Sequence, residues 1–305
     1  MKRAIITGAT GAIGTALIQE LISRKIEVLV FCRENSTRNE RIPEHPLVTK
    51  CTCDLKDLAT VENTTGKTYD VFYHFAWAGT IGSARNDMYL QNDNVRYSLD
   101  AVKAAKRFGC TTFIGAGSQA EYGRVEGTLC PNTPTQPENG YGIAKLCSGL
   151  MTREQAHSLG MRHIWMRVLS IYGPNDGAKT MIMSVLNSMQ NGCIPQCTKG
   201  EQKWDYLYSK DAATAFYLVG EKGKDGKTYV LGSGQIDTLS NYIETLCREF
   251  GFTKGAALGA IPYAPKQVMY LCADISDLQY DTGFIPQYTF NDGIKETILW
   301  FKENT

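Results

Sequence analysis

The stretch TGATGAIGTALIQELI, which begins at Thr7, constrains the fold of this chain more than any other feature. It has glycines at positions 8, 11 and 14, and an apolar pattern with helical spacing follows them directly. The residues before it, RAIIT, form a short apolar run typical of a buried strand. The segment therefore predicts a strand, a tight turn and a helix. Such a helix start presents free amides and a partial positive charge, which suit a pyrophosphate.

The rest of the first half alternates in the same way between short apolar runs and longer helical patterns. We expect strands at 3–8, 27–33, 47–53, 70–76, 111–118 and 162–173, and helices at 12–24, 94–108 and 142–159. Strand and helix repeated in this order predict an α/β fold, a doubly wound parallel sheet of the Rossmann type with both faces covered.

After about residue 169 the pattern loosens, and glycine, proline and asparagine recur. Residues 228–234 are expected to return to the sheet as a further strand, and helices are expected at 180–190, 210–221, 238–250 and 291–303. We therefore divide the chain into a dinucleotide-binding domain (1–168 and 203–235) and a smaller substrate-binding lobe (169–202 and 236–305).

Composition excludes several classes of partner. The chain has 32 basic and 31 acidic residues, so nothing favours nucleic acid or an anionic membrane. No apolar run is long enough to span a bilayer, and the N-terminal MKRAIITG is expected to be a strand and not a signal sequence. Its 10 cysteines form no Cys-x-x-Cys pair and lie near no histidine with zinc spacing. We expect no metal and a reducing, cytoplasmic location.

The end of the second predicted strand indicates the type of cofactor. In NAD-binding proteins an acidic residue there binds the ribose, but this chain has Cys32 followed by Arg33. Without the carboxylate a 2′-phosphate is not repelled, and a guanidinium can bind it with two hydrogen bonds. Ser36 and Arg38 could add donors. The sequence favours NADP(H), with NAD(H) as the alternative. Asp54-Leu55, after the next strand, fits a contact to the adenine edge.

Tyr141 and Lys145 stand four residues apart at the start of a predicted helix, so they share one face. A nearby lysine cation favours the phenolate, so it is expected to lower the pKa of the tyrosine and make it a usable general acid or base. Upstream, the strand TTFIGAGS ends in Ser118, whose hydroxyl can hydrogen-bond a substrate oxygen.

Together the motifs TGATGAIG, YHFAWAG, GSQAEYG, YGIAK and KWDYLYSKDAA resemble the extended short-chain dehydrogenases/reductases, in the branch of nucleotide-sugar epimerases, dehydratases and reductases. The resemblance covers essentially the whole chain. It implies a Rossmann domain, a nucleoside-diphosphate sugar in the cleft, and Ser118, Tyr141 and Lys145 as the catalytic set. It also implies a homodimer formed through residues 94–108 and 142–159.

Two departures from the family pattern separate the branches. In the 4,6-dehydratases a Thr-Asp-Glu run stands where this chain has Ser118-Gln119-Ala120, so the acid and base for eliminating water are missing. Where the family often has an arginine that touches the diphosphate, this chain has Trp204 beside Lys203. Trp204 either stacks on a ring of the substrate or packs in the core.

The motifs and the resemblance together give a full set of expected site residues. Among other polar residues, we expect His74 to be a core histidine and Asn94 to tie a helix to a strand. Expected cofactor contacts are Gly8, Thr10, Gly11, Ala12, Ile13, Arg33, Asp54, Leu55, Phe75, Ala76, Tyr141 and Lys145, and expected substrate contacts are Ser118, Gln119, Asn175, Lys179 and Trp204.

The favoured function is the NADPH-dependent reduction of a keto group, at C4, on a nucleoside-diphosphate sugar. One alternative is an NAD(P)-dependent 4-epimerase similar to UDP-glucose 4-epimerase, which would use the same three residues. A second alternative is a non-catalytic sensor or scaffold that binds NADP. The complete Ser/Tyr/Lys set argues against it, since a sensor has no need of a tuned phenol.

Overall fold

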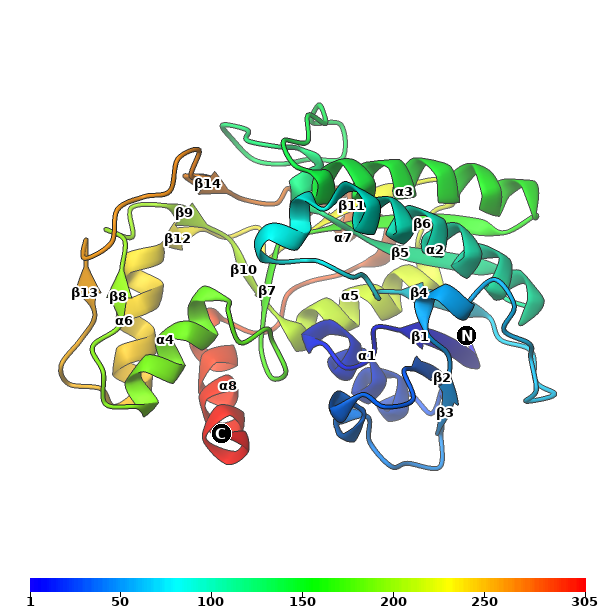
Figure 1. The fold of residues 1–305 in the computed structure, drawn as a ribbon, viewed down its shortest axis with the longest axis horizontal. Helices are drawn as coiled ribbons and strands as arrows, with labels where there is room; N and C mark the ends of the chain where they lie inside the picture. The colour runs from blue at the N-terminus through cyan, green and yellow to red at the C-terminus, as the bar shows by residue number, and fades with distance from the viewer.

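The computed structural model describes residues 1–305 and is built around one parallel sheet of seven strands. The strand order is β11-β6-β5-β4-β1-β2-β3, and every neighbouring pair is parallel (Figure 1). The strands are β1 (Arg3–Thr7), β2 (Glu27–Cys32), β3 (Val48–Thr52), β4 (Val71–His74), β5 (Thr112–Ser118), β6 (Arg162–Val168) and β11 (Thr228–Leu231). The predicted α/β fold with a doubly wound parallel sheet is confirmed.

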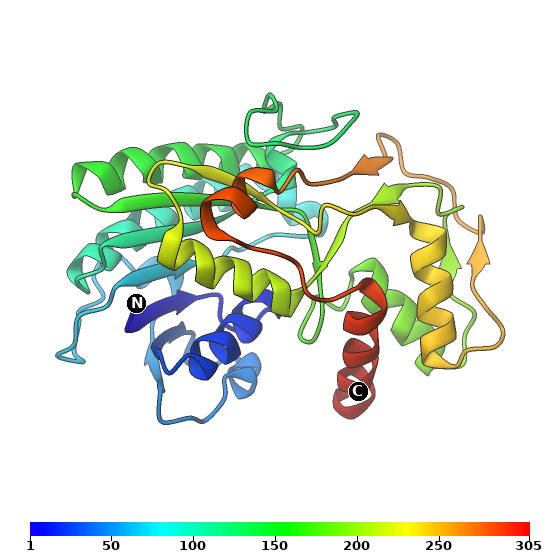
Figure 2. The same cartoon turned by 180° about the vertical axis from the view of Figure 1, so that it is seen from behind.

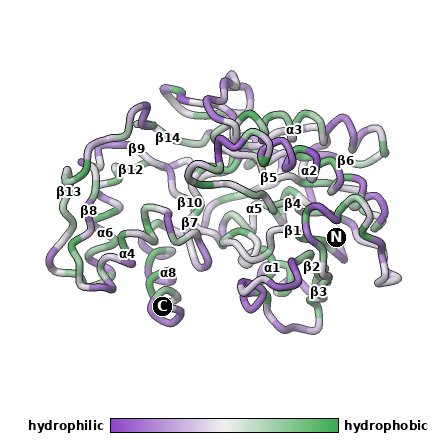
Figure 3. The backbone as a smooth tube through the Cα atoms, viewed as in Figure 1, coloured by the Kyte–Doolittle hydropathy of each residue, from purple (hydrophilic) through white to green (hydrophobic).

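Helices cover both faces of this sheet. On one face α1 (Ala12–Ser23) packs against α5 (Ser209–Lys222), and on the other α2 (Met88–Arg107) packs against α3 (Gly140–Ser158), as Figures 1 and 2 show. Alternate residues of a strand point to opposite faces, so Ile6 joins the core under α1 and α5 while Ile5 joins the core under α2. Figure 3 shows hydrophobic colour along the central strands and hydrophilic colour on the outer loops.

The strand expected at 162–173 divides into two. β6 stays in the sheet, whereas β7 (Ser170–Tyr172) leaves it and pairs with β10 (Tyr206–Tyr208). Residues 228–231 return to the sheet beside β6, as predicted. The helix expected from residue 94 begins at Met88, because the Asp87 carboxylate caps it by accepting a hydrogen bond from Leu90 N at 3.1 Å.

The remainder of the chain forms a second cluster of elements on the carboxyl-end side of the sheet (Figure 1). Its helices α4 (Met181–Gln190), α6 (Leu239–Phe250) and α8 (Phe290–Asn304) enclose a separate apolar core. The short strands are β8 (Gln196–Cys197), β9 (Lys203–Trp204), β12 (Asp237–Thr238), β13 (Ala257–Leu258) and β14 (Tyr270–Leu271). No helix of the chain is both long and apolar enough to cross a membrane.

One late segment packs with the sheet. Helix α7 (Ser276–Thr282), which the sequence pattern does not predict, lies against α5 and β11. Leu271, Leu278 and Phe284 belong to the same core as β1 and α1, although the predicted division assigns them to the second lobe. The domain boundaries themselves stay a prediction.

Candidate active site

The glycine-rich turn has three glycines with two different roles. Gly8 has φ +72°, and a Cβ there would lie 2.6 Å from Ala76 N. A Cβ on Gly14 would lie 2.5 Å from Gly8 O and 2.7 Å from Ala9 Cα. Gly11 is different, because its Cβ would meet nothing nearer than Gly8 O at 3.9 Å. Gly8 and Gly14 are therefore required by the protein's own packing, and Gly11 keeps space open in front of the helix.

Helix α1 begins at this turn with unused hydrogen-bond donors. Gly11 is its N-cap residue and supplies no side-chain acceptor, so the N–H groups of Ala12, Ile13 and Gly14 have no partner in the protein. The turn opens onto a cleft of about 490 Å³. Eight of the expected cofactor contacts line that cleft: Gly8, Thr10, Gly11, Arg33, Asp54, Leu55, Phe75 and Ala76. Free amides at a helix start next to such a cleft fit a dinucleotide pyrophosphate.

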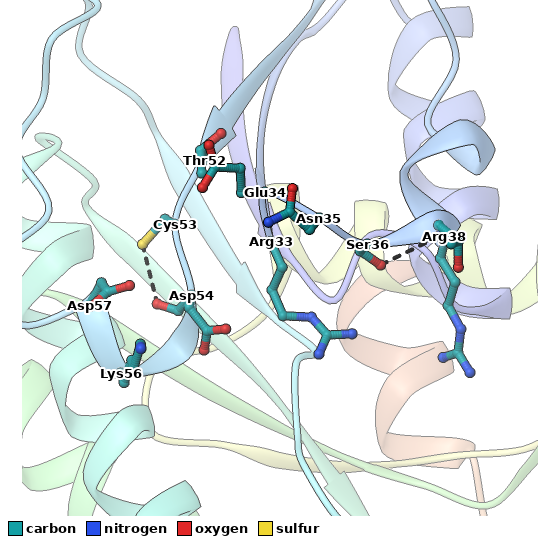
Figure 4. Close-up of a pocket in the computed structure, with 11 residues that line it drawn as sticks. Arg33, Glu34, Asn35, Ser36, Arg38, Thr52, Cys53, Asp54, Lys56 and Asp57 are labelled. Carbon is teal, nitrogen blue, oxygen red and sulfur yellow. Dashed lines mark hydrogen bonds between the residues drawn. The ribbon is translucent and has the colours of Figure 1, made fainter.

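A polar pocket of about 680 Å³ adjoins the cleft where β2 and β3 end. Figure 4 shows the Arg33 and Arg38 side chains extending in the same direction on either side of Ser36, with Asp54 opposite. No carboxylate forms an ion pair with either guanidinium. Two unpaired cations beside one hydroxyl fit a phosphate on the adenosine ribose.

A third arginine, Arg41, belongs to this region and was missed by the sequence interpretation. It lies at the end of the 3₁₀ helix η1 (Thr37–Arg41), and its Nη1 donates to Thr10 O at 3.2 Å. Burial and the neighbouring Arg38 charge lower the pKa of Arg41. The contact ties the glycine-rich turn to the loop after β2. It joins residues 31 positions apart, so local spacing gives no signal for it.

Tyr141 and Lys145 lie on the first turns of α3, as predicted. Asn139 caps this helix by accepting a hydrogen bond from Gly142 N at 2.9 Å. The Lys145 side chain is buried, donates from Nζ to Ala116 O at 2.6 Å, and lies 3.8 Å above the ring centroid of Trp77. Trp77 also lines the cleft and packs edge-on against the Tyr141 ring, with a centroid separation of 6.1 Å. This tryptophan therefore connects the two predicted catalytic residues to the cleft.

Ser118 ends β5 beside a buried carboxylate that the sequence interpretation missed. Glu121, in the 3₁₀ helix η4 (Gln119–Glu121), has no exposed surface, and its Oε1 accepts from Ser118 N at 2.8 Å. The same oxygen accepts from Trp165 Nε1 at 2.9 Å, while Oε2 accepts from Arg167 Nε at 2.8 Å. Both carboxylate oxygens are thus occupied. The charged residue within the otherwise uncharged motif GSQAEYG was the available signal.

The electrostatics of the predicted catalytic residues are dominated by burial. Burial raises the pKa of Tyr141, while hydrogen bonding with the Ser118 hydroxyl and the charge of Arg85 act to lower it. Burial also lowers the pKa of Lys145 to about 7, against an opposing contribution from the Glu121 charge. The pKa of Tyr141 is therefore raised in this structure, contrary to the expected lowering by Lys145. The Lys145 ammonium lies 5.9 Å from the Tyr141 ring centroid.

Comparisons with known proteins identify the family of this chain. Residues 4–232 match the family described as the NAD dependent epimerase/dehydratase family. The chain belongs to this family. A dTDP-4-dehydro-6-deoxyglucose reductase of Escherichia coli is 26% identical over 311 residues, 96% of this chain and 96% of the relative. A dTDP-glucose 4,6-dehydratase of Neisseria gonorrhoeae is 22% identical over 337 residues, 99% of this chain and 96% of the relative.

Among solved structures, the fold is similar to that of a UDP-N-acetylglucosamine 4-epimerase from Methanobrevibacter ruminantium in complex with UDP-N-acetylmuramic acid. The TM-score is 0.89 with 23% identity, over 100% of this chain and 99% of the other. The NAD dependent epimerase/dehydratase family consists of enzymes. The three similar proteins named above are, by their names, a reductase, a dehydratase and a 4-epimerase of nucleotide sugars.

The residues expected to contact the substrate do not line one cleft together, unlike most of the expected cofactor contacts. Asn175 has φ +64° and donates from Nδ2 to Thr15 Oγ1 at 3.4 Å, across from the first turn of α1. Trp204 donates from Nε1 to Ser170 Oγ at 2.7 Å and packs against the main core. Lys179 is exposed just before α4, and Gln119 is half-buried next to Ser118. Their contacts with a substrate stay predictions.

His74 and Asn94, two polar residues expected to have structural roles, are both buried. His74 is buried, its Nδ1 lies 2.9 Å from Thr7 Oγ1, and its Nε2 lies 3.3 Å from Ser98 Oγ. Asn94 accepts a hydrogen bond from Ala78 N and donates one to Ala78 O, both at 2.9 Å. The prediction that His74 is a core residue is confirmed. Asn94 links helix α2 to the loop that follows β4, and not to the strand itself as expected.

Proposed function

We propose that this protein is an NADPH-dependent reductase of a 4-keto group on a nucleoside-diphosphate sugar. The observation that carries the cofactor preference is the pair Arg33 and Arg38, which have no carboxylate partner and face the pocket where β2 and β3 end. The residue that follows β2 is Arg33 and not an acid that would bind the free ribose of NAD. The pocket lining also includes carboxylates, but the two guanidiniums are free to bind a phosphate. NADP(H) is the proposed cofactor.

The proposed catalytic residues are Ser118, Tyr141 and Lys145. When bound, the nicotinamide cofactor supplies the hydride. The Tyr141 hydroxyl donates the proton to the sugar oxygen, and the Ser118 hydroxyl donates a hydrogen bond to that oxygen as charge develops on it. Lys145 adds positive charge beside the phenol from a buried position fixed by Ala116 O.

Dehydration fits the local residues poorly, although one relative is a dehydratase. Elimination of water needs an acid and a base on the sugar, and the positions after Ser118 carry Gln119 and Ala120. The next residue, Glu121, is fully buried and accepts hydrogen bonds from Ser118 N, Trp165 and Arg167. It is therefore unsuited to exchanging a proton with a substrate.

The substrate proposal rests on the family and on one relative. The Escherichia coli relative is a reductase whose name gives a 4-dehydro-6-deoxy sugar on dTDP, and the alignment with it spans 96% of each chain. We infer a substrate of the same class. Gln119 would contact the sugar, Asn175 and Lys179 would contact the sugar or phosphate groups, and Trp204 would lie beside the nucleotide sugar.

We also propose a homodimer. On α3 the side chains of Ile143, Leu150 and Met151 are 51%, 49% and 45% exposed, at spacings that share one helix face. On the adjacent α2, Met88 and Tyr89 are 56% and 88% exposed. Exposed apolar side chains along α3 and at the first turn of the adjacent α2 are typical of a surface covered in a dimer. Light scattering of the purified protein tests this assignment.

The functional test uses purified protein, NADPH or NADH, and dTDP-4-dehydro-6-deoxyglucose. We expect one NADPH consumed for each ketone reduced, with NADH a poor substitute. Arg33→Asp should weaken NADPH binding by at least tenfold without weakening NADH binding, because it removes the guanidinium that contacts the phosphate and adds a carboxylate that can bind the free ribose of NAD. Arg248→Asp, on the exposed face of α6, is the matched control.

A different outcome would favour the epimerase. Cofactor that remains bound through purification, together with interconversion of 4-epimers without net loss of NADPH, would reject the reductase. The same three residues would then serve transient oxidation and return of the hydride. Tighter binding of NADH than of NADPH would reject the cofactor assignment alone.

A further inference from the structure

The loop after β4 packs closely on the first turn of the catalytic helix α3. Gly140 N donates to Asn86 Oδ1 at 3.1 Å, in the 3₁₀ helix η3 (Gly82–Asn86). A Cβ on Gly140 would lie 2.8 Å from Met88 Sδ and 3.0 Å from Arg85 O. The absence of a side chain at Gly140 therefore allows η3 to approach Tyr141.

Arg85 uses this approach to lie over the face of the Tyr141 ring. Its Cζ is 4.3 Å from the ring centroid, and its Nη1 donates to Thr80 O at 3.0 Å. No carboxylate forms an ion pair with Arg85. Trp77 meets the same ring edge-on at an interplanar angle of 85°. The Tyr141 ring is thus held between a guanidinium and an indole, both from the segment that follows β4.

Arg85 is the nearer of the two cations that face this ring. Lys145 Nζ lies 5.9 Å from the Tyr141 centroid but only 3.8 Å from the Trp77 centroid, and it donates to Ala116 O. The Lys145 charge is therefore shared with an indole face and a carbonyl. The Arg85 charge has one carbonyl partner and otherwise faces the phenol.

We propose that Arg85 is a positioning residue for Tyr141. The Arg85 guanidinium fixes the Tyr141 ring against Trp77 and stabilises the ionised form of Tyr141. This inference rests on the proposed role of Tyr141 and deepens it. A cation over an aromatic face is attracted to the ring electrons, and a phenolate carries more negative charge than a phenol. The contact therefore favours loss of the hydroxyl proton, which is the event the proposed reaction requires.

The other groups that face Tyr141 come from three elements. The Ser118 hydroxyl at the end of β5 lowers the pKa of Tyr141, the Glu121 carboxylate in η4 raises it, and Lys145 lies one turn along α3. Burial raises the pKa most, so Arg85 and Ser118 oppose burial. Removing the Arg85 charge should therefore move the ionisation of Tyr141 to higher pH.

The test compares Arg85→Gln and Arg85→Lys with the unmodified protein. The ionisation of Tyr141 is followed in the protein without cofactor or substrate, as the difference in phenolate absorbance between each protein and its Tyr141→Phe counterpart. We expect Arg85→Gln to raise the titration midpoint by roughly 0.5–1.5 pH units, and Arg85→Lys to restore most of the shift.

Activity provides the second readout. In the reduction of a 4-keto nucleotide sugar, Arg85→Gln should lower kcat several-fold with little change in KM, and the alkaline decline should move to higher pH. Arg24→Gln is the matched control, because the Arg24 guanidinium lies 4.2 Å over the Tyr217 ring, at the end of α1. It should leave both readouts unchanged, and similar melting temperatures show that all variants fold.

An unchanged Tyr141 titration in folded Arg85→Gln would overturn the proposal. A rise in KM alone would also overturn it, since that result assigns Arg85 to substrate binding. The titration needs neither cofactor nor substrate, so its outcome is separate from the proposed function. A shifted titration in a protein that reduces no keto-sugar would reject the reductase and keep the role of Arg85.

Discussion

Arg167 donates from Nε to Glu121 Oε2 at 2.8 Å in an ion pair that lies almost entirely inside the protein. The carboxylate also accepts from Ser118 N and Trp165 Nε1. A Cβ on Gly117 would lie 2.3 Å from Trp165 Nε1 and 2.4 Å from Glu121 Oε1, so this strand approaches the pair without side chains. The pair therefore fixes the strand end that carries Ser118.

The first prediction concerns this pair. Arg167→Met leaves the Glu121 charge buried without its partner and should reduce the free energy of unfolding by roughly 3–5 kcal/mol. Urea denaturation measures the change. Arg124→Met is the control, because Arg124 pairs with Glu138 at 2.8 Å on the surface, where solvent screens the charges, and should cost far less than Arg167→Met. Equal losses of unfolding free energy in the two variants would show that the buried Glu121 pair stabilises the protein no more than the exposed pair does.

The glycines of the first turn give a second prediction. Gly14→Ala forces a Cβ to within 2.5 Å of Gly8 O and should destabilise the protein by roughly 1–3 kcal/mol. Gly11→Ala has φ −90° and no close neighbour, so its stability should change by less than about 1 kcal/mol. It should nevertheless weaken binding of NADPH at least tenfold. Unfolding curves and fluorescence titration separate the two effects, and intact NADPH binding by Gly11→Ala would contradict the pyrophosphate site.

The sequence predicted those parts of the site that depend on short spacing. Three features are local: the glycine turn, the i,i+4 pair Tyr141 and Lys145, and Ser118 at a strand end. A single sequence is therefore enough to predict them. Helix α2 was predicted too short because its first turn, MYLQND, lacks an apolar face and depends on the Asp87 cap.

The contacts that orient these residues could not be predicted in the same way. Trp77 lies against Lys145, Arg85 over Tyr141, and Arg167 against Glu121. The two residues of each pair are at least 46 positions apart in the chain, and only the folded sheet brings them together. The need for glycine at positions 117 and 140 could not be predicted either, because a Cβ there would meet Trp165 and Met88, which are distant in sequence.

The third prediction concerns acid. Burial lowers the pKa of both His74 and His163 to about 3. An unfolded histidine has a pKa near 6.5, so between about pH 3 and 6.5 the unfolded chain binds more protons, and stability falls as pH falls. At pH 5 each residue should cost about 2 kcal/mol relative to pH 7. Thermal unfolding across this range measures the loss.

A variant isolates the contribution of one histidine. His74→Asn removes the titrating ring, so its stability should decline less steeply between about pH 6.5 and 5 than that of the unmodified protein. His45→Asn, at an exposed position, should keep the original slope. A slope that is identical in the His74 variant would show that this ring does not control the acid sensitivity.

The last prediction addresses the proton donor itself. Tyr141→Phe keeps the ring under Arg85 and beside Trp77 but removes the hydroxyl near Ser118. Turnover of a 4-keto nucleotide sugar should fall by roughly 10²–10⁴-fold, because the substitution removes the proposed proton donor. Binding of NADPH should stay within a few-fold of normal, since the lining of the adenosine pocket is unaltered.

Steady-state kinetics and fluorescence titration measure the two quantities on the same preparation. Tyr280→Phe, at an 89% exposed tyrosine, controls for the loss of a phenol as such. Retained turnover in Tyr141→Phe would assign the proton to another group and reject the proposed mechanism.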